Sequence, residues 1–183
     1  SVFAEQRGGV MRQIGGWGLA LGDEGSGAVL GRALLARALR ARLVEIGRSC
    51  VHPDYRTGAT ITLLWSGLAQ YMTEQGYDYL MGCASISMAD GGHAAASLYN
   101  QLSGNLGPLE YRVFPRCPLP LAALKKDQPA EMPPLIKAYL RAGAWVCGEP
   151  AWDPDFNTAD LPILMPMGRV SGRYAKHYLG KTG

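Results

Sequence analysis

A strand, a short polar loop and an amphipathic helix follow one another between Leu43 and Tyr71, and this order constrains the fold more than any other feature. The stretch reads LVEIGRSCVHPDYRTGATITLLWSGLAQY. We predict a strand over Leu43 to Val51 and a helix over Thr60 to Gln75, with one apolar face at helical spacing: Ile61, Leu64, Trp65, Leu68 and Met72. The N–H groups of the RTGAT loop and of the first helical turn lack partners within the helix, so they predict an anion site to which Arg56 adds charge.

Further strands and helices alternate along the chain, which predicts an α/β fold. Tyr77 to Ile86 is an apolar strand, and Gly91-Gly92 separates it from a helix over His93 to Leu102. A strand-helix-strand order implies that the strands at 43–51 and 77–86 run parallel, in a mixed sheet, and we expect them to splay apart at the loop. Four further elements are predicted: a strand at Leu109 to Phe114, a Pro-rich loop at 118–134, a helix at Leu135 to Ala142 and a strand at Leu161 to Met165.

The first 41 residues predict a hairpin followed by a helix. Val2 to Glu5 and Val10 to Ile14 can pair across Arg7-Gly8-Gly9, and a helix from Ser26 to Ala41 has Ser26 as its N-cap. The leucines of this helix form one apolar face, so we expect it to dock on a sheet.

Composition excludes several classes of protein. At 183 residues, with 48% hydrophobic and 18% charged residues, the chain is most simply one domain. It has no apolar run of bilayer length and no visible signal peptide, so we expect a cytoplasmic protein, with peripheral contact at the inner face of the membrane as an option. Its four cysteines lack CxxC spacing, which indicates free thiols and no zinc site.

The net charge of +3 is too small to predict nucleic-acid binding. Basic residues nevertheless cluster around the helix at 26–41 and near the C-terminus. These are either solvated helix faces or a surface for an acidic protein or anionic lipid headgroups. The clustered residues are Arg32, Arg37, Arg40, Arg42, Arg169, Arg173, Lys176, His177 and Lys181.

Specific motifs identify a family resemblance over residues 43–179. GCASI at 82–86, LIKAYLRAGA at 135–144, VCGEPAWDPDFNTADL at 146–161 and the closing LMPMGRVSGRYAKHYL resemble the GNAT-type N-acyltransferases of ornithine-lipid synthesis, the hemolysin-like or N-acyl amino acid synthase family. The resemblance implies a GNAT-like mixed sheet flanked by helices over residues 42–183. It also implies transfer of a fatty acyl group, in particular a 3-hydroxyacyl group, from acyl carrier protein or acyl-CoA to the α-amine of ornithine or a related amino acid. No permanently bound cofactor and no metal are expected.

The resemblance also assigns candidate site residues. The acyl donor would lie on Val51, Arg56, Thr57, Gly58, Ala59 and Thr60. Glu45, on the strand leading to the loop, would remove the proton from the amine, unless it pairs with Arg42 or Arg48; His52 is the weaker alternative. Tyr99 would donate to the leaving thiolate, or it is a packing residue.

Three further roles near these residues can be weighed. A backbone N–H near Cys50 or Val51 would meet the oxyanion. Cys50 lacks a visible His and carboxylate constellation, so direct transfer is favoured over an acyl-cysteine. Asp153, Asp155, Asn157 and Asp160 lack the Gly and Glu of a calcium loop, so they predict a turn that lines the substrate pocket.

Residues 1–41 resemble a different family. GGWG followed by GDEGSG resembles an internal piece of the BadF/BadG-type ATPases and N-acetylglucosamine kinases, and it implies a sugar-site role for Trp17 and Asp23. The phosphate-binding lobe and catalytic Asp of that family are absent, so the chain is expected to be chimeric, with a foreign hairpin-helix segment where part of the substrate pocket is normally built. An inactive chimera or scaffold is therefore the alternative to an acyltransferase, and a sugar kinase fragment is a remote third.

Overall fold

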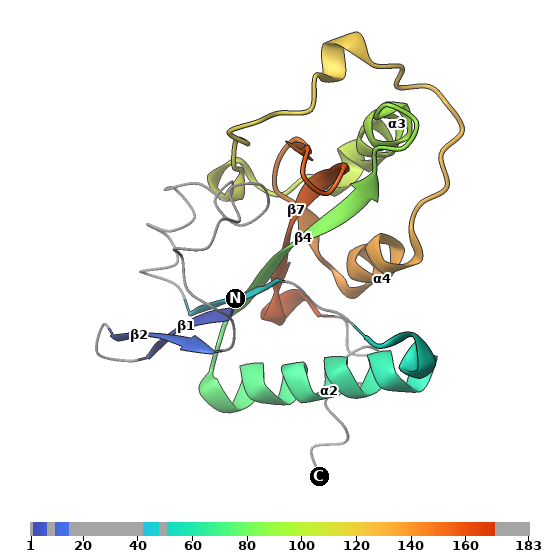
Figure 1. Ribbon diagram of the computed structural model, residues 1–183. Coiled ribbons are helices and arrows are strands. Elements are labelled where there is room, and N and C mark those ends of the chain that lie inside the picture. The colour runs from blue at the N-terminus through green and yellow to red at the C-terminus, as the bar shows by residue number, and fades with distance from the viewer. Residues whose placement is uncertain (1, 7–9, 15–41, 48–50, 171–183) are drawn as a thin grey trace.

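The computed structural model of the chain describes residues 2–6, 10–14, 42–47 and 51–170 (Figure 1). Its strands form one seven-stranded sheet in the order β2-β1-β3-β4-β7-β5, with β6 also paired to β7. The predicted mixed α/β sheet flanked by helices is confirmed. The elements are β1 (Val2–Gln6), β2 (Val10–Ile14), β3 (Leu43–Ile46), α2 (Gly58–Gln75), β4 (Tyr79–Ser87), α3 (His93–Gln101), α4 (Pro134–Ala142), β5 (Trp145–Val146), β6 (Ala151–Asp153) and β7 (Thr158–Pro166).

The N-terminal strands pair as the sequence predicts. β1 and β2 are antiparallel, with a register that runs from Val2↔Ile14 to Gln6↔Val10. β1 joins the rest of the sheet beside β3 through the pair Ala4↔Val44. The turn at 7–9 and the helix predicted at 26–41, with its N-cap Ser26, lie outside the described residues.

β3 and β4 are parallel, as predicted, and α2 connects them. Their ladder runs only from Leu43↔Tyr79 to Ile46↔Gly82, whereas β4 continues to Ser87. β3 therefore ends five residues before the predicted end at Val51. In the described part of the chain, β4 beyond Gly82 pairs only with β7, so the described ladder between the two parallel strands ends at this point.

Gly82 marks the end of this parallel pairing for a steric reason. A Cβ added there would lie 2.7 Å from the carbonyl oxygen of Ile46. Only glycine therefore permits this approach of the β3 backbone.

α2 is anchored at both ends. The Thr57 side chain caps its N-terminus, and Gly76, at φ +66°, closes its C-terminus by donating to the carbonyls of Met72 and Thr73. Met72 is fully buried, but Leu64 is 56% exposed, so its predicted place on the packed apolar face of this helix is wrong. The Trp65 ring packs edge-on against the Tyr139 ring of α4, with 5.4 Å between the ring centroids, and Leu64 lies outside this contact.

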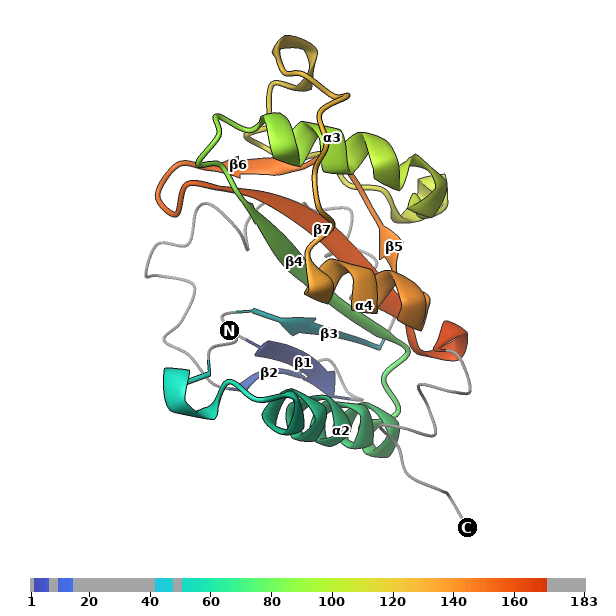
Figure 2. The same cartoon turned by 90° about the vertical axis from the view of Figure 1, so that its right-hand side faces the viewer.

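The three described helices share one side of the sheet. α2, α3 and α4 contribute Met72, Leu98 and Ile136 to a single core cluster with Leu80 of β4 and Leu161 of β7. Figure 2 shows α4 across β4 and β7, with α3 and α2 toward opposite ends of the sheet. No helix in the described residues is long and apolar enough to cross a membrane.

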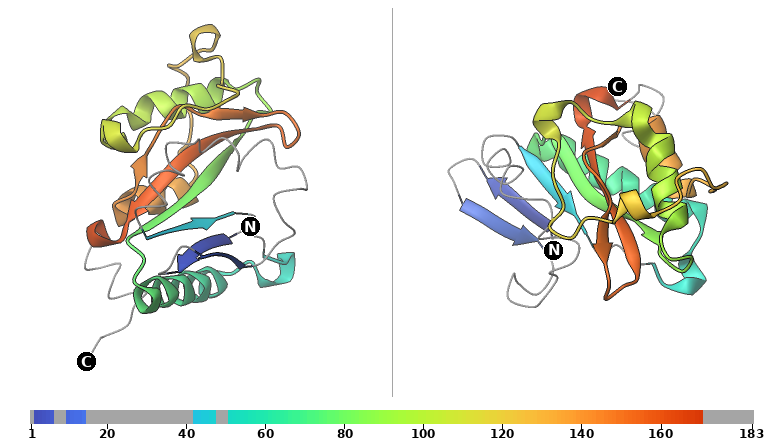
Figure 3. Two further views of the ribbon diagram at one scale, coloured as in Figure 1. Left: turned by 90° about the vertical axis from the view of Figure 1, so that its left-hand side faces the viewer. Right: turned by 90° about the horizontal axis from the view of Figure 1, so that it is seen from above.

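A smaller cluster covers the opposite face, which Figure 3 presents in its left view. It joins Met81 of β4 and Leu164 of β7 to Val113 and Cys147. The Val113 N–H donates to the Cys147 carbonyl at 2.7 Å, so the segment that precedes the Pro-rich loop is tied to the chain just after β5.

The predicted strand at Leu109 to Phe114 is wrong. Leu109–Tyr111 forms a 3-10 turn instead, between Pro108 and Pro115, which have no N–H to donate to a ladder. The helix at Pro134–Ala142 and the irregular Pro-rich loop before it are confirmed.

The C-terminal strands differ from the prediction in extent and number. β7 is longer than the predicted 161–165, and β5 and β6 were not predicted. Pro162 lies between the residues of β7 that pair with β5 and those that pair with β6. Its carbonyl accepts from the Cys147 N–H at 2.8 Å, on the side away from β4, so its missing N–H costs the β4–β7 ladder nothing.

The close approach of Ile46 to Gly82 can be tested by Gly82→Ala. The added methyl group must displace the β3 backbone, so we expect the free energy of unfolding to fall by about 1–3 kcal/mol in guanidinium denaturation. Gly67→Ala is the matched control, because a Cβ there meets nothing within 4 Å. In a helix interior that control should be neutral or stabilise by up to about 1 kcal/mol. Equal stability of Gly82→Ala and the parent would show that this contact does not constrain the strands.

Candidate functional site

The loop between β3 and α2 is built around the cap of α2. The Thr57 hydroxyl accepts the Thr60 N–H at 3.2 Å, while the N–H groups of Arg56 and Thr57 bond to the carbonyls of Pro53 and Tyr55. Three donors of the predicted anion site are therefore already used within the loop. The N–H groups of Gly58 and Ala59 have no partner in the described part of the chain, so they are the donors left for a ligand.

Gly58 and Arg56 shape the outer side of this loop. A Cβ at Gly58 would meet nothing within 4 Å, so packing does not require glycine there. The Arg56 Nε donates to the Val51 carbonyl at 3.0 Å, which holds the exposed guanidinium beside the loop and leaves its two terminal nitrogens outside that bond. The predicted donor residues from Val51 to Thr60 thus form one continuous, largely exposed segment.

His52 serves this loop as a hydrogen-bonding residue. Its Nδ1 accepts the Asp54 N–H at 3.4 Å and lies 3.6 Å from the Asp54 carboxylate. This contact caps the 3-10 turn Pro53–Tyr55.

Glu45 lies on the central part of β3, half-buried, opposite Met81 of β4. Burial raises the pKa of its carboxyl above the usual value near 4.5. Arg42, one of its two predicted partners, instead pairs with Asp78 at 3.3 Å, and Arg48 is outside the described residues. A carboxylate with a raised pKa is a suitable proton acceptor for an amine.

The described cysteines are all free, as predicted, and Cys50 lies outside the described residues. Burial, with the charges of Asp160 and Glu45, raises the pKa of Cys83 to about 12, and burial raises that of Cys147 to about 12. Both thiols are therefore protonated at neutral pH and unsuited to nucleophilic attack. The strand registers place Glu45, Cys83 and Asp160 on one face of the sheet, because Glu45 is opposite Met81 and Asp160 is opposite Ser85.

The acidic segment after β6 is a turn, as predicted. The buried Asp153 carboxylate accepts the N–H groups of Asp155 and Phe156 at 3.0 and 3.1 Å, and Asn157 has a φ of +51°. The described residues contain no group of three or more His, Cys, Asp or Glu side chains that could hold a metal ion.

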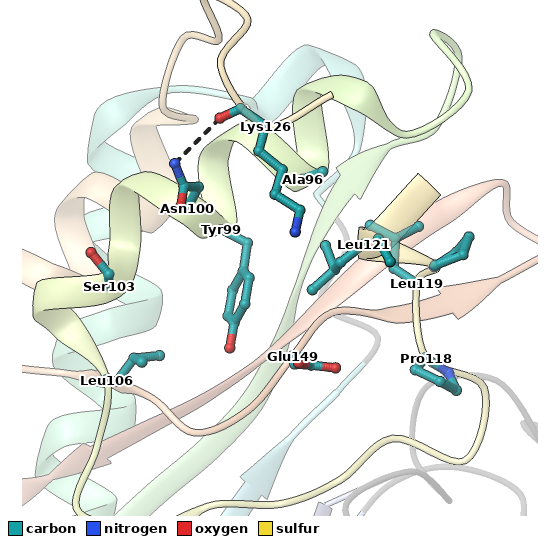
Figure 4. A pocket seen from close by; sticks show the side chains of 12 residues that line it. Ala96, Tyr99, Asn100, Ser103, Leu106, Pro118, Leu119, Leu121, Lys126 and Glu149 are labelled. Atoms are coloured by element: carbon teal, nitrogen blue, oxygen red, sulfur yellow. Dashed lines mark hydrogen bonds between the residues drawn. The ribbon is translucent and has the colours of Figure 1, made fainter. Parts of the chain in front are cut away.

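Tyr99 lines a half-open cavity of about 520 Å³ (Figure 4). α3 forms one wall, the segment 118–122 forms the other, and Leu106, Lys126 and Glu149 complete the lining. Burial raises the pKa of the Tyr99 phenol, and the charge of Glu149 adds to this effect while that of Arg112 opposes it. The volume is within the range of about 300–1,000 Å³ that small-molecule sites occupy.

The structure keeps the candidate residues in two places. Glu45 and the loop 51–60 belong to one short segment around the end of β3, whereas Tyr99 lies in the cavity beside α3, whose lining includes no residue of that segment. Sequence reasoning missed Lys126 and Glu149 as cavity residues. Glu149 lies within a motif that carried the family resemblance, but nothing in the sequence links Lys126 to Tyr99.

Of the predicted basic clusters, only Arg42 and Arg169 lie among the described residues. Arg42 pairs with Asp78, and the Arg169 guanidinium lies over the Trp145 ring at 4.7 Å from its centroid. The remaining basic residues of both clusters, like Trp17 and Asp23, lie outside the described residues.

Comparison with known families places part of this site in a recognised domain. Residues 28–66 match the acetyltransferase (GNAT) domain, and this match includes β3, the loop 51–60 and the first half of α2. It begins inside the segment 1–41, so residues 28–41 share the domain match and the kinase-like resemblance. The mixed sheet and its flanking helices are consistent with a GNAT fold.

The chain is similar over most of its length to proteins named L-ornithine N(alpha)-acyltransferase. It is 37% identical to that of Rhizobium meliloti (strain 1021) over 159 residues, which is 82% of this chain and 53% of the relative. Identity is 36% with that of Agrobacterium fabrum (81% of this chain, 54% of the relative) and 40% with that of Rhodobacter capsulatus (78% and 57%). The chain thus spans about half the length of these relatives. No solved structure matches it significantly.

The burial of Glu45 predicts a pH-dependent effect on stability. Folding raises the pKa of Glu45 above its usual value of 4.5. The contribution of Glu45 to folding stability is therefore fully present below pH 4.5 and is lost as the pH rises through the folded pKa. Glu45→Gln removes the ionisation, so we expect the parent to lose stability relative to this variant as the pH rises from about 4.5 to about 7. Urea denaturation of both proteins at several pH values measures the difference. Glu131→Gln, at an exposed position, is the control, and a stability difference for Glu45→Gln that does not change with pH would contradict the burial argument.

Proposed function

We propose that this chain carries an N-acyltransferase activity that moves a fatty acyl group, in particular a 3-hydroxyacyl group, from a carrier-protein or CoA thioester to the α-amine of ornithine or a related amino acid. The relatives named above support the reaction and the acceptor. The observation that carries the proposal is the end of the described β3–β4 ladder at Ile46↔Gly82, followed by a loop in which the N–H groups of Gly58 and Ala59 have no partner among the described residues.

The proposed donor site uses both parts of this arrangement. The β4 edge beyond Gly82 offers backbone groups that can bond to the amides of pantetheine. The N–H groups of Gly58 and Ala59, with the Arg56 guanidinium, would hold the phosphate end of the donor. Acyl carrier protein presents one phosphate and CoA a diphosphate, and the same cradle suits either. An acidic carrier protein or an anionic membrane surface would be attracted by basic residues such as Arg56.

The proposed chemistry is direct transfer. Glu45 would take a proton from the acceptor ammonium, the neutral amine would attack the thioester carbonyl, and a backbone N–H near Val51 would stabilise the oxyanion. The C–N bond forms and the C–S bond breaks, and Tyr99 would give a proton or a hydrogen bond to the departing thiolate. The raised thiol pKa values of Cys83 and Cys147 support direct attack over an acyl-cysteine at either residue.

Gly58→Val tests the donor cradle. A β-branched side chain at this position should keep a phosphate away from the Gly58 and Ala59 N–H groups, and we expect donor binding to weaken about tenfold or more, or about 1.4 kcal/mol. Calorimetric titration with acyl-CoA and with acylated carrier protein measures this. Gly67→Val is the matched control in the same helix, since a Cβ at either position meets nothing within 4 Å. Unchanged donor affinity in Gly58→Val would mean that the loop is only a turn.

Glu45→Gln tests the proton acceptor. It retains the shape and hydrogen bonding of Glu45 but not its basicity, so turnover should fall about 10²-fold or more while donor binding persists. The parent must first show acylation of ornithine, because the chain spans about half of its relatives. Full turnover of Glu45→Gln across the pH range would assign the proton to another group, with His52 or a water chain as the next candidate.

A further inference from the structure

The cavity beside α3 combines an apolar body with two isolated charges. Its walls are mainly aliphatic and include Leu106, Leu119 and Leu121, while Lys126 and Glu149 are its charged residues. In Figure 4 the Lys126 side chain reaches into the cavity from one end, and Glu149 lies near the hydroxyl end of Tyr99 at the other. An elongated ligand can therefore contact both charges and lay an apolar stem along the wall between them.

The two charges do not neutralise each other. Among the described residues, no ion pair joins the Lys126 ammonium to the Glu149 carboxylate, and neither charged group has a hydrogen-bond partner. An apolar ligand would reduce the solvation of both groups without replacing it. A lone anion would suit Lys126 but be repelled by Glu149, and a lone cation the reverse. A ligand with groups of both signs satisfies both residues.

The walls that carry these residues are fixed by backbone contacts. The Asn100 side-chain amide of α3 donates to the Lys126 backbone carbonyl at 3.4 Å. The Leu119 N–H donates to the carbonyl of Pro150, next to Glu149, at 2.9 Å. The backbone at each charged residue is thus tied to a different wall, and both charged side chains are exposed to an incoming ligand.

We propose that this cavity is the acceptor subsite and binds an α-amino acid with a second ammonium group at the end of its side chain. Lys126 pairs with the α-carboxylate, Glu149 pairs with the terminal ammonium, and the methylene stem lies on the leucines. The inference rests on the proposed function, because that function supplies the need for such an acceptor. It assigns specificity to Lys126 and Glu149.

Calorimetric titration of three ligands, each with and without CoA, distinguishes the contact at Lys126 from the contact at Glu149. Ornithine has the carboxylate and the terminal ammonium, norvaline lacks the terminal ammonium, and butane-1,4-diamine lacks the carboxylate. In Lys126→Met, affinity for ornithine and norvaline should fall about tenfold while that for the diamine does not. In Glu149→Gln, affinity for ornithine and the diamine should fall about tenfold while that for norvaline does not.

Matched controls keep the result specific. Lys125→Met changes the adjacent exposed lysine, which does not line the cavity, and Glu131→Gln changes a remote exposed carboxylate. Neither should alter any of the three affinities. The inference is overturned if ornithine does not bind the parent under either condition, if all three ligands weaken equally in both variants, or if the controls have the same effect as the cavity variants.

Steady-state kinetics separate this inference from the proposed function. If Lys126→Met and Glu149→Gln change the three affinities as expected but the parent shows no acyl transfer, the subsite is upheld and the activity of this chain is rejected. Transfer by the parent with an unchanged ornithine KM in both cavity variants would uphold the activity and reject the subsite.

Discussion

The contact between the Ile46 carbonyl and Gly82 is the constraint on which the rest of this structure depends. It allows the β3 backbone to approach β4 at the last pair of their parallel ladder, after which only β7 accompanies β4 among the described residues. If β3 continued beside β4, the edge of β4 would be filled, and the chain could not turn outward into the loop that begins α2. The absence of a side chain at Gly82 thus permits the last described pair of this ladder.

Local patterns predicted the segment around this opening, because its signals are local. The apolar runs predicted at 43–51 and 77–86 and the apolar period of the helix predicted from Thr60 are all properties of neighbouring residues, whereas the Thr57 cap that starts α2 two residues earlier was not predicted. The predictions failed where residues distant in the sequence decide the local structure. Leu64 fits the apolar period of α2 but lies outside its packed face, and β5 and β6 are too short to show a period and exist because β7 offers partners on its outer side. Leu109 to Phe114 has strand-like composition, but prolines at both sides remove the donors that a ladder needs.

The candidate site divides in the same way. Glu45 and the loop 51–60 are close in sequence, so their grouping into one candidate region could be predicted from a single motif. The cavity around Tyr99 draws on α3, the Pro-rich loop and the link between β5 and β6, which only the fold brings together. Lys126 has no sequence signal as a cavity residue, because a lysine in a polar loop is ordinarily a solvated one.

β4 connects these two regions physically. Its first half pairs with β3 beside Glu45, and its last residue leads through Gly91-Gly92 into α3, which carries Tyr99. β7 pairs with β4 along its whole length, from Tyr79↔Pro166 to Ser87↔Thr158, so the distance between the two regions is set by a strand that cannot shift without breaking nine residue pairs. A reaction that joins two substrates gains most from holding them in a fixed relation. The proposed donor loop and the proposed acceptor cavity can therefore each be tested separately, because β4 links the two regions.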